Sequence, residues 1–231
     1  MIKAVFFDLY QTLVRYEPPR EEIEAKVLKD FGIETSAAVL VNPLIAADEF
    51  IYNEIARLPL SKRSREEKIG LYVQYQEVLL REAGIKYDRK VLPGLVAAMQ
   101  KSAMDLALFD DVIPALTDLK GRGLILGLIS NIEQNMTDTL TKLGLPAWLE
   151  IIVTSLDAGA GKPRPEIFRK ALEKGGVKPG ESIYIGDQYR VDVLGARGAG
   201  MMGILIDRGD YYKDISDCPR IKSLTEVADY L

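Results

Sequence analysis

Short, mainly apolar runs alternate with helical periodicity along much of this chain. The apolar runs predict buried strands, which we place at residues 4–7, 124–129, 151–153, 182–185 and 202–206. Apolar or small residues at helical spacing predict helices between the strands, at residues 111–120, 131–143, 165–173 and 191–199. Strands that alternate with helices indicate an α/β fold, in which helices cover both faces of a parallel sheet.

Residues 15–105 break this alternation. Helical spacing in this segment predicts helices and no strand, with the helices at residues 20–31, 42–58, 65–83 and 90–104. The pair Pro18-Pro19 marks where the segment begins. We therefore expect an α/β core formed by residues 1–14 and 106–231, with an all-helical domain, residues 15–105, inserted directly after the first strand.

Polar side chains suited to chemistry follow several of the predicted strands. They are Asp8-Leu9-Tyr10-Gln11-Thr12, Ser130-Asn131, Lys162, and Gly186-Asp187-Gln188-Tyr189-Arg190-Val191-Asp192. Ligands of parallel sheets bind beyond the carboxyl ends of the strands. Each group alone has an ordinary explanation as a turn or a helix cap, and Asn131 is expected to cap the helix that follows it. Their occurrence at successive strand ends predicts a single site.

The first and fourth groups suit a nucleophile and a metal. The carboxylate of Asp8 can attack phosphorus or carbon and form a covalent intermediate. An anionic substrate would be repelled by this carboxylate, so the site needs a cation between the two. Asp8, the carbonyl of Tyr10 and Asp187 would supply hard oxygen ligands for Mg²⁺.

The remaining polar groups suit the binding of a substrate. Ser130 and backbone N–H groups near Leu9 and Asn131 would hold substrate oxygens as charge develops on them. Lys162 would neutralise the charge that remains. With Thr12 from the first group, these residues form the predicted substrate-binding set.

Composition narrows the possible chemistry. The chain of 231 residues has no histidine, which excludes Ser-His-Asp and Cys-His catalysis and histidine-containing zinc sites. Its single cysteine, Cys218, excludes an internal disulfide, and no role is assigned to it. The net charge of −4 implies no basic face for nucleic acid, and no apolar run is long enough for a membrane span. We expect a cytoplasmic protein whose partner is a small anionic substrate, without nucleic acid or membrane.

Jointly, the four groups resemble the motifs of the haloacid dehalogenase superfamily. The four motifs of this family are matched in order by FFDLYQTL, ISN, GKPRPEIF and GDQYRVD. The helical insert resembles the family's C1 cap domain. The resemblance implies a Rossmann-like parallel sheet core and a magnesium-dependent hydrolase, with Asp8 as the nucleophile. Ser130 and Lys162 would bind phosphate, Asp187 would bind the metal, and Asp192 would support the metal site or orient Lys162.

Tyr10 departs from the pattern of the family's phosphatases, which carry an aspartate there as general acid and base. The family's haloacid dehalogenases have tyrosine at this position, but their fourth motif lacks the metal carboxylate that Asp187 would supply. We therefore expect a phosphatase that forms an aspartyl-phosphate on a small phosphorylated metabolite. A 2-haloacid dehalogenase that forms an aspartyl ester, or a weakly catalytic protein that binds a phosphometabolite, is the alternative. Tyr10 is either a catalytic phenol or a packing residue.

Substrate choice is expected to lie in the insert. Candidate side chains there are Tyr16, Arg20 and Tyr52.

Overall fold

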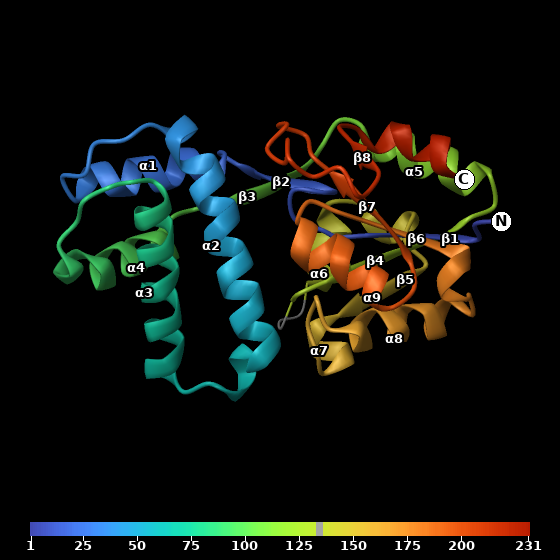
Figure 1. Ribbon diagram of the computed structural model, residues 1–231, viewed down its shortest axis with the longest axis horizontal. Helices are drawn as coiled ribbons and strands as arrows, with labels where there is room; N and C mark the ends of the chain where they lie inside the picture. Colours follow the sequence, from blue (N-terminus) through green and yellow to red (C-terminus); the bar gives the residue numbers. More distant parts are fainter. Residues whose placement is uncertain (133–135) are drawn as a thin grey trace. The chain divides into compact units, whose positions relative to one another are not determined.

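The computed structural model describes residues 1–132 and 136–231 and divides into two compact units (Figure 1). The first unit comprises Met1–Arg15 and Ala107–Leu231, and the second comprises Tyr16–Leu106. The segments that join the units pair as a two-stranded sheet of β2 (Val14–Glu17) and β3 (Asp105–Leu108). The role of the second unit as a cap stays a prediction.

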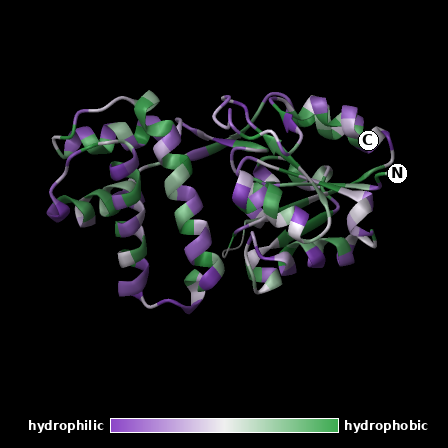
Figure 2. Cartoon of the chain, in the orientation of Figure 1, coloured by the Kyte–Doolittle hydropathy of each residue, from purple (hydrophilic) through white to green (hydrophobic). Residues whose placement is uncertain are grey.

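A six-stranded parallel sheet forms the centre of the first unit, in the order β5-β4-β1-β6-β7-β8. The strands are β1 Ala4–Phe7, β4 Ile125–Ser130, β5 Ile151–Thr154, β6 Ser182–Gly186, β7 Met202–Ile206 and β8 Arg220–Ile221. Every residue of β1 and β6 is buried, and the strands are mostly hydrophobic (Figure 2). The register sets Phe7 beside Leu128 and Ile185. The residues that follow β1, β4 and β6 therefore leave the sheet at one edge.

Helices cover the sheet on both sides. α8 (Pro165–Gly175) and α9 (Leu194–Gly198) share one buried apolar cluster with the strands, whereas α5 (Val112–Gly121) lies on the opposite side from α8 (Figure 1). The other helical elements of this unit are α6 Thr137–Lys142, η3 Leu145–Ala147, α7 Ser155–Ala158, η4 Pro179–Glu181, the π-helix η5 Tyr189–Val193, and η6 Leu224–Tyr230. The predicted α/β class with a Rossmann-like parallel sheet is confirmed.

The second unit is helical between its two ends. Its helices are α1 Arg20–Asp30, α2 Ala37–Arg57, η1 Leu60–Lys62, α3 Arg65–Glu82, η2 Arg89–Val91 and α4 Leu92–Lys101. Ser64 and Glu67 form a capping box at the start of α3, in which each side chain accepts a backbone hydrogen bond from the other residue. Within the two described ranges of the chain, no helix is long and apolar enough to cross a membrane.

Several predicted boundaries were wrong. α2 begins at Ala37 rather than at residue 42, and Pro43, a residue type that is more usual at the start of a helix, lies inside it on the buried face. β2 and β3 were missed because both are short and only partly buried, so neither forms an apolar run. The helix predicted at residues 191–199 begins as the π-helix η5 before α9 continues it. The start of the predicted helix 131–143 falls partly at residues 133–135, outside the described residues, and α6 begins at Thr137.

Candidate active site

Asp8 directly follows β1 and lies at the edge of the sheet where the predicted groups meet. Its backbone N–H donates to the carbonyl of Ile185 in β6 at 2.8 Å, which continues the strand pairing to this residue. The residue is only 6% exposed. Ser130, the last residue of β4, donates from its hydroxyl to Asp8 Oδ1 at 3.2 Å. This hydrogen bond joins two residues that are 122 positions apart in the sequence.

Lys162 lies between two carboxylates. Its Nζ donates to Asp8 Oδ1 at 2.6 Å, to Asp192 Oδ1 at 2.7 Å and to the hydroxyl of Tyr184 at 2.8 Å. All four side chains are buried. An ammonium has three N–H donors, so each donor of Lys162 has an acceptor.

Burial and neighbouring charges act against each other here. Burial raises the pKa of Asp8, Lys162 lowers it, and Asp192 raises it further, so the net direction is upward. Burial alone would lower the pKa of Lys162, but the carboxylates of Asp192 and Asp8 outweigh it and raise this pKa. Lys162 is therefore an ammonium in this environment.

The backbone of Lys162 is held by Asn131. The side-chain Nδ2 of Asn131 donates to the carbonyl of Lys162 at 2.9 Å, and its Oδ1 accepts from the N–H of Lys162 at 2.6 Å. The prediction that Asn131 caps the following helix was wrong, since α6 has Met136 at its N-cap. A Cβ at Gly161 would come within 3.0 Å of Asn131 Oδ1. A glycine at this position therefore leaves room for Asn131.

Asp192 reaches the site from the π-helix η5, a rare element that is frequent at functional sites. Its Oδ1 also accepts from the Tyr184 hydroxyl at 3.0 Å, and its Oδ2 accepts from the backbone N–H of Gln188 at 3.0 Å. A Cβ at Gly186 would lie 2.3 Å from Asp192 Cγ. Glycine at the end of β6 is therefore required for the carboxylate to lie where it does.

The carboxylates of Asp8, Asp187 and Asp192 form a group that can hold a metal ion. One oxygen from each lies within 4.8 Å of the others. Lys162 donates to two of them, Asp8 and Asp192. Three carboxylates gathered this closely offer the hard oxygen ligands that suit a divalent cation. Because both oxygens of Asp192 already accept hydrogen bonds, Asp8 and Asp187 are the better metal ligands.

The rest of the first motif lies around Asp8 in different ways. Tyr10 is partly buried, and burial followed by the charge of Asp8 raises the pKa of its phenol. The backbone N–H of Leu9 lowers the pKa of Asp8, as expected for a donor close to the carboxylate. The hydroxyl of Thr12 is buried and has no hydrogen-bond partner among the described residues, while its carbonyl accepts from Arg208 at 2.9 Å. Among the described residues, the Thr12 hydroxyl therefore makes no hydrogen bond to the carboxylate of Asp8.

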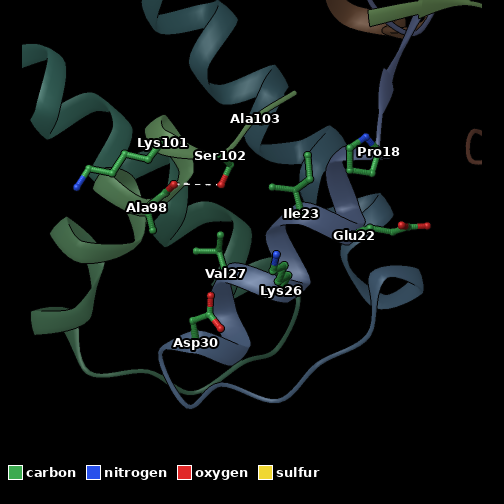
Figure 3. A pocket seen from close by; sticks show the side chains of 10 residues that line it. All are labelled: Pro18, Glu22, Ile23, Lys26, Val27, Asp30, Ala98, Lys101, Ser102 and Ala103. Carbon is green, nitrogen blue, oxygen red and sulfur yellow. Dashed lines mark hydrogen bonds between the residues drawn. The ribbon is translucent and has the colours of Figure 1, made fainter. Parts of the chain in front are cut away.

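The second unit holds a cavity of about 580 Å³ beside α1 and the end of α4 (Figure 3). Lys26 and Lys101 line it together with acidic Glu22 and Asp30, so its charges are mixed. None of the motif residues lines this cavity. Of the candidates for substrate choice in this unit, Arg20 donates two hydrogen bonds to Asp48 and its guanidinium also lies over the ring of Tyr16.

Tyr184 was missed from the sequence. This tyrosine lies within an apolar strand, where it is expected to be a packing residue. It also lies outside the four motifs. A buried phenol needs a hydrogen-bond partner, and this requirement was the available signal.

Comparisons with known proteins agree with the four motifs. A family model described as haloacid dehalogenase-like hydrolase matches residues 2–200. The chain is 31% identical over 216 residues to a glyceraldehyde 3-phosphate phosphatase of Methanopyrus kandleri, covering 91% of this chain and 86% of the relative. It is 28% identical to a phosphoserine phosphatase of Thermus thermophilus, covering 98% of each chain.

Similarity of fold extends to proteins with a different activity. The crystal structure of a 2-haloacid dehalogenase from Pseudomonas syringae matches with a TM-score of 0.58 and 24% identity, covering 99% of this chain and 97% of the other. At this level of identity the match supports the fold alone.

Proposed function

The chain belongs to the haloacid dehalogenase-like hydrolase family, and we propose that it is a magnesium-dependent phosphatase acting on a small phosphorylated metabolite. One observation carries the proposal. Ser130 and Lys162 both donate to the same carboxylate oxygen of Asp8. Asp187 offers an oxygen within 4.8 Å of the ligand oxygens of Asp8 and Asp192. Similarity to relatives named as phosphatases supports the same activity.

In this proposal Asp8 attacks phosphorus and forms an aspartyl-phosphate, while the bond between phosphorus and the leaving oxygen breaks. Ser130, Lys162 and the N–H groups of Leu9 and Asn131 hold the phosphoryl oxygens. Water then hydrolyses the aspartyl-phosphate and releases inorganic phosphate. Bound magnesium would offset the repulsion between the nucleophile and the substrate.

The roles of the remaining residues follow from the same proposal. Asp8, Asp187 and the carbonyl of Tyr10 would hold the metal, and Asp192 would act through Lys162. Thr12 stays a predicted substrate ligand without supporting contact. The cytoplasmic location also stays a prediction.

Tyr10 favours a second candidate, a 2-haloacid dehalogenase. A halide leaves without a proton, so a site without a carboxylate at this position suits its departure. The grouping of Asp187 with Asp8 and Asp192 weighs against this candidate, because such a group suits a metal ion and an aspartyl-ester mechanism for haloacids has no use for one.

A paired assay separates the candidates. We expect phosphate release from an aryl phosphate with Mg²⁺, loss of that release in EDTA, and no halide release from a 2-chloro acid. Halide release that persists in EDTA would support the dehalogenase. Binding of phosphometabolites without release of either product would support the binding protein.

A further inference from the structure

Tyr184 lies at the centre of β6, and its side chain is wholly buried. Its ring packs edge-on against Phe168 of α8, with ring centroids 5.1 Å apart and an interplanar angle of 89°. This packing fixes the ring and directs its hydroxyl to Lys162 and Asp192. The hydroxyl is also within 3.2 Å of the carbonyl of Ile129.

The phenol completes the set of acceptors around the ammonium. Lys162 donates one N–H to Asp8, one to Asp192 and one to Tyr184. The phenol then donates its own proton to Asp192 or to the carbonyl of Ile129. Burial, followed by the charges of Asp192 and Asp8, raises the pKa of Tyr184 well above its usual value, so the phenol keeps that proton.

The three acceptors of Lys162 differ in how firmly they are anchored. Asp192 is fixed by the backbone N–H of Gln188, and Tyr184 is fixed by its ring and by Ile129. The oxygen of Asp8 must instead give up its hydrogen bond from Lys162 before it can attack a substrate. The contact from Lys162 to Asp8 is therefore the one that has to change during a reaction.

We propose that Tyr184 is a positioning residue that, together with Asp192, holds the ammonium of Lys162 in place. Only the N–H that now donates to Asp8 then changes its acceptor and donates to a substrate oxygen. This inference rests on the proposed function for the identity of that oxygen. Without the phenol, one N–H of a buried ammonium would lack an acceptor, and the ammonium would turn to find another one. The charge that meets the substrate would then be misplaced, which lowers turnover more than binding.

Tyr184→Phe tests the proposal, because it keeps the ring on Phe168 and removes only the hydroxyl. We expect kcat to fall about tenfold, the worth of one hydrogen bond to a charged group, while KM changes less than about threefold. The second readout is the ¹⁵N resonance of Lys162 Nζ in protein without substrate, assigned by its loss in Lys162→Arg. In Tyr184→Phe this resonance should shift, and its protons should exchange with water about tenfold faster.

Tyr75→Phe is the matched control. It removes a phenol that donates to a carboxylate, Asp48, at 3.0 Å in the other unit, so it should leave the Lys162 resonance unchanged. An unchanged Lys162 resonance in Tyr184→Phe would overturn the proposal, as would an unchanged kcat. If Tyr184→Phe does not fold, exchange of the Lys162 ammonium in the unaltered protein decides, because exchange as fast as that of exposed lysines contradicts three fixed acceptors. The resonance needs no substrate, so it is informative even if no phosphate is released.

Discussion

The two units each bury a cluster of charged side chains, and the clusters use similar groups in different proportions. In the first unit, the ammonium of Lys162 lies between Asp8 and Asp192, and the phenol of Tyr184 completes its contacts. Asp187 lies close to both carboxylates, so this cluster brings three carboxylates together, and that of the proposed nucleophile Asp8 is one of them.

The second unit contains a cluster centred on an arginine. Arg20 of α1 donates to both oxygens of Asp48 of α2, at 2.8 and 2.6 Å, and the phenol of Tyr75 of α3 donates to Asp48 at 3.0 Å. Glu24 is wholly buried beside this pair, and neither of its oxygens has a hydrogen-bond partner within the described residues. Burial raises the pKa of Glu24 to about 7, against smaller opposing effects of Gln76 and Arg20.

The difference lies in how each cluster deals with its extra carboxyl group. In the second unit burial raises the pKa of Glu24 to about 7, which favours the uncharged, protonated form of this carboxyl group below that pH. In the first unit, hydrogen bonds and Lys162 hold Asp8 and Asp192 in place, and we propose that a metal ion offsets the charge that the three carboxylates bring together. A cluster that only supports the fold can protonate its extra carboxyl group, whereas the proposed active site needs its carboxylates charged.

The same change made in both clusters should give opposite results. Asp8→Asn keeps the shape of the side chain but removes the nucleophile, so turnover should fall by about 10⁴-fold. The free energy of unfolding should change little, because burial already disfavours the charged form of Asp8 and Lys162 keeps Asp192 and Tyr184 as acceptors. Steady-state kinetics and thermal unfolding measure both effects.

Asp118→Asn is the control for this variant, since Asp118 is an exposed residue of α5. Retention of more than a few per cent of turnover in Asp8→Asn would remove Asp8 from the role of nucleophile.

Asp48→Asn should instead reduce stability. It leaves the half-buried guanidinium of Arg20 without its carboxylate, and breaking a pair that is mostly removed from water costs about 3 kcal/mol. Denaturant unfolding followed in the second unit measures the loss. A loss below about 1 kcal/mol would mean that the pair adds little, as for an ion pair at a surface.

Tyr10→Asp adds a carboxylate beside the cluster around Lys162 and so tests how that cluster differs from the one around Arg20. A phenol with a raised pKa is a poor base and a reluctant acid at neutral pH. We therefore expect aryl and acyl phosphates, whose leaving groups are stable anions, to be the better substrates of the unaltered protein. Tyr10→Asp should raise turnover of alkyl phosphates by about 10²-fold, the usual effect of a placed acid or base.

Comparing alkyl and aryl phosphates in both proteins measures this effect. Unchanged or lower alkyl turnover in Tyr10→Asp would mean that the site uses another proton donor or is not a phosphatase.

Glu24→Gln tests the proton in the second cluster. Because the pKa of Glu24 is about 7 in the folded protein and 4.5 is its ordinary value, the folded state binds more protons between these values. Stability should therefore fall as pH rises from about 4.5 to about 7 and then level off. One pKa unit corresponds to about 1.4 kcal/mol, so the full loss is about 3 kcal/mol.

Glu24→Gln should remove most of this dependence and stabilise the second unit at pH 8 but not at pH 4. Unfolding measured at both pH values tests it. Glu22→Gln is the control for net charge, because Glu22 is exposed on the same helix. An equal gain in both variants would show that charge alone, rather than burial, is responsible.

The sequence predicted the strands and the four motifs well because both depend on local pattern. The apolar runs of β1, β6 and β7 are typical of buried strands. In a parallel sheet the polar residues that follow such strands meet at one edge, so the site could be predicted there. The contacts of Asn131 and Tyr184 could not be predicted in this way. Asn131 binds a backbone 31 residues away, and Tyr184 contacts a lysine 22 residues away. Such partners depend on packing between elements, which local pattern does not encode.

The cluster around Arg20 was outside prediction for a related reason. Its members come from three helices. Arg20 was considered only as a candidate for substrate choice, and the other members resemble ordinary polar positions on amphipathic helices. Only the packing of α1, α2 and α3 reveals that Asp48 and Glu24 are buried.

The position of β1 in the sheet has a consequence for synthesis of the chain on the ribosome. β1 is made first, but its neighbours are β4, which begins at Ile125, and β6, which begins at Ser182. A nascent chain that ends between Leu106 and the start of β4 contains all of the second unit, yet it offers the apolar segment Ala4–Phe7 no partner in this sheet. Domains generally fold as units, in the order of their synthesis. The helices of the second unit can therefore fold before the strands that position Asp8, the proposed nucleophile, have been made.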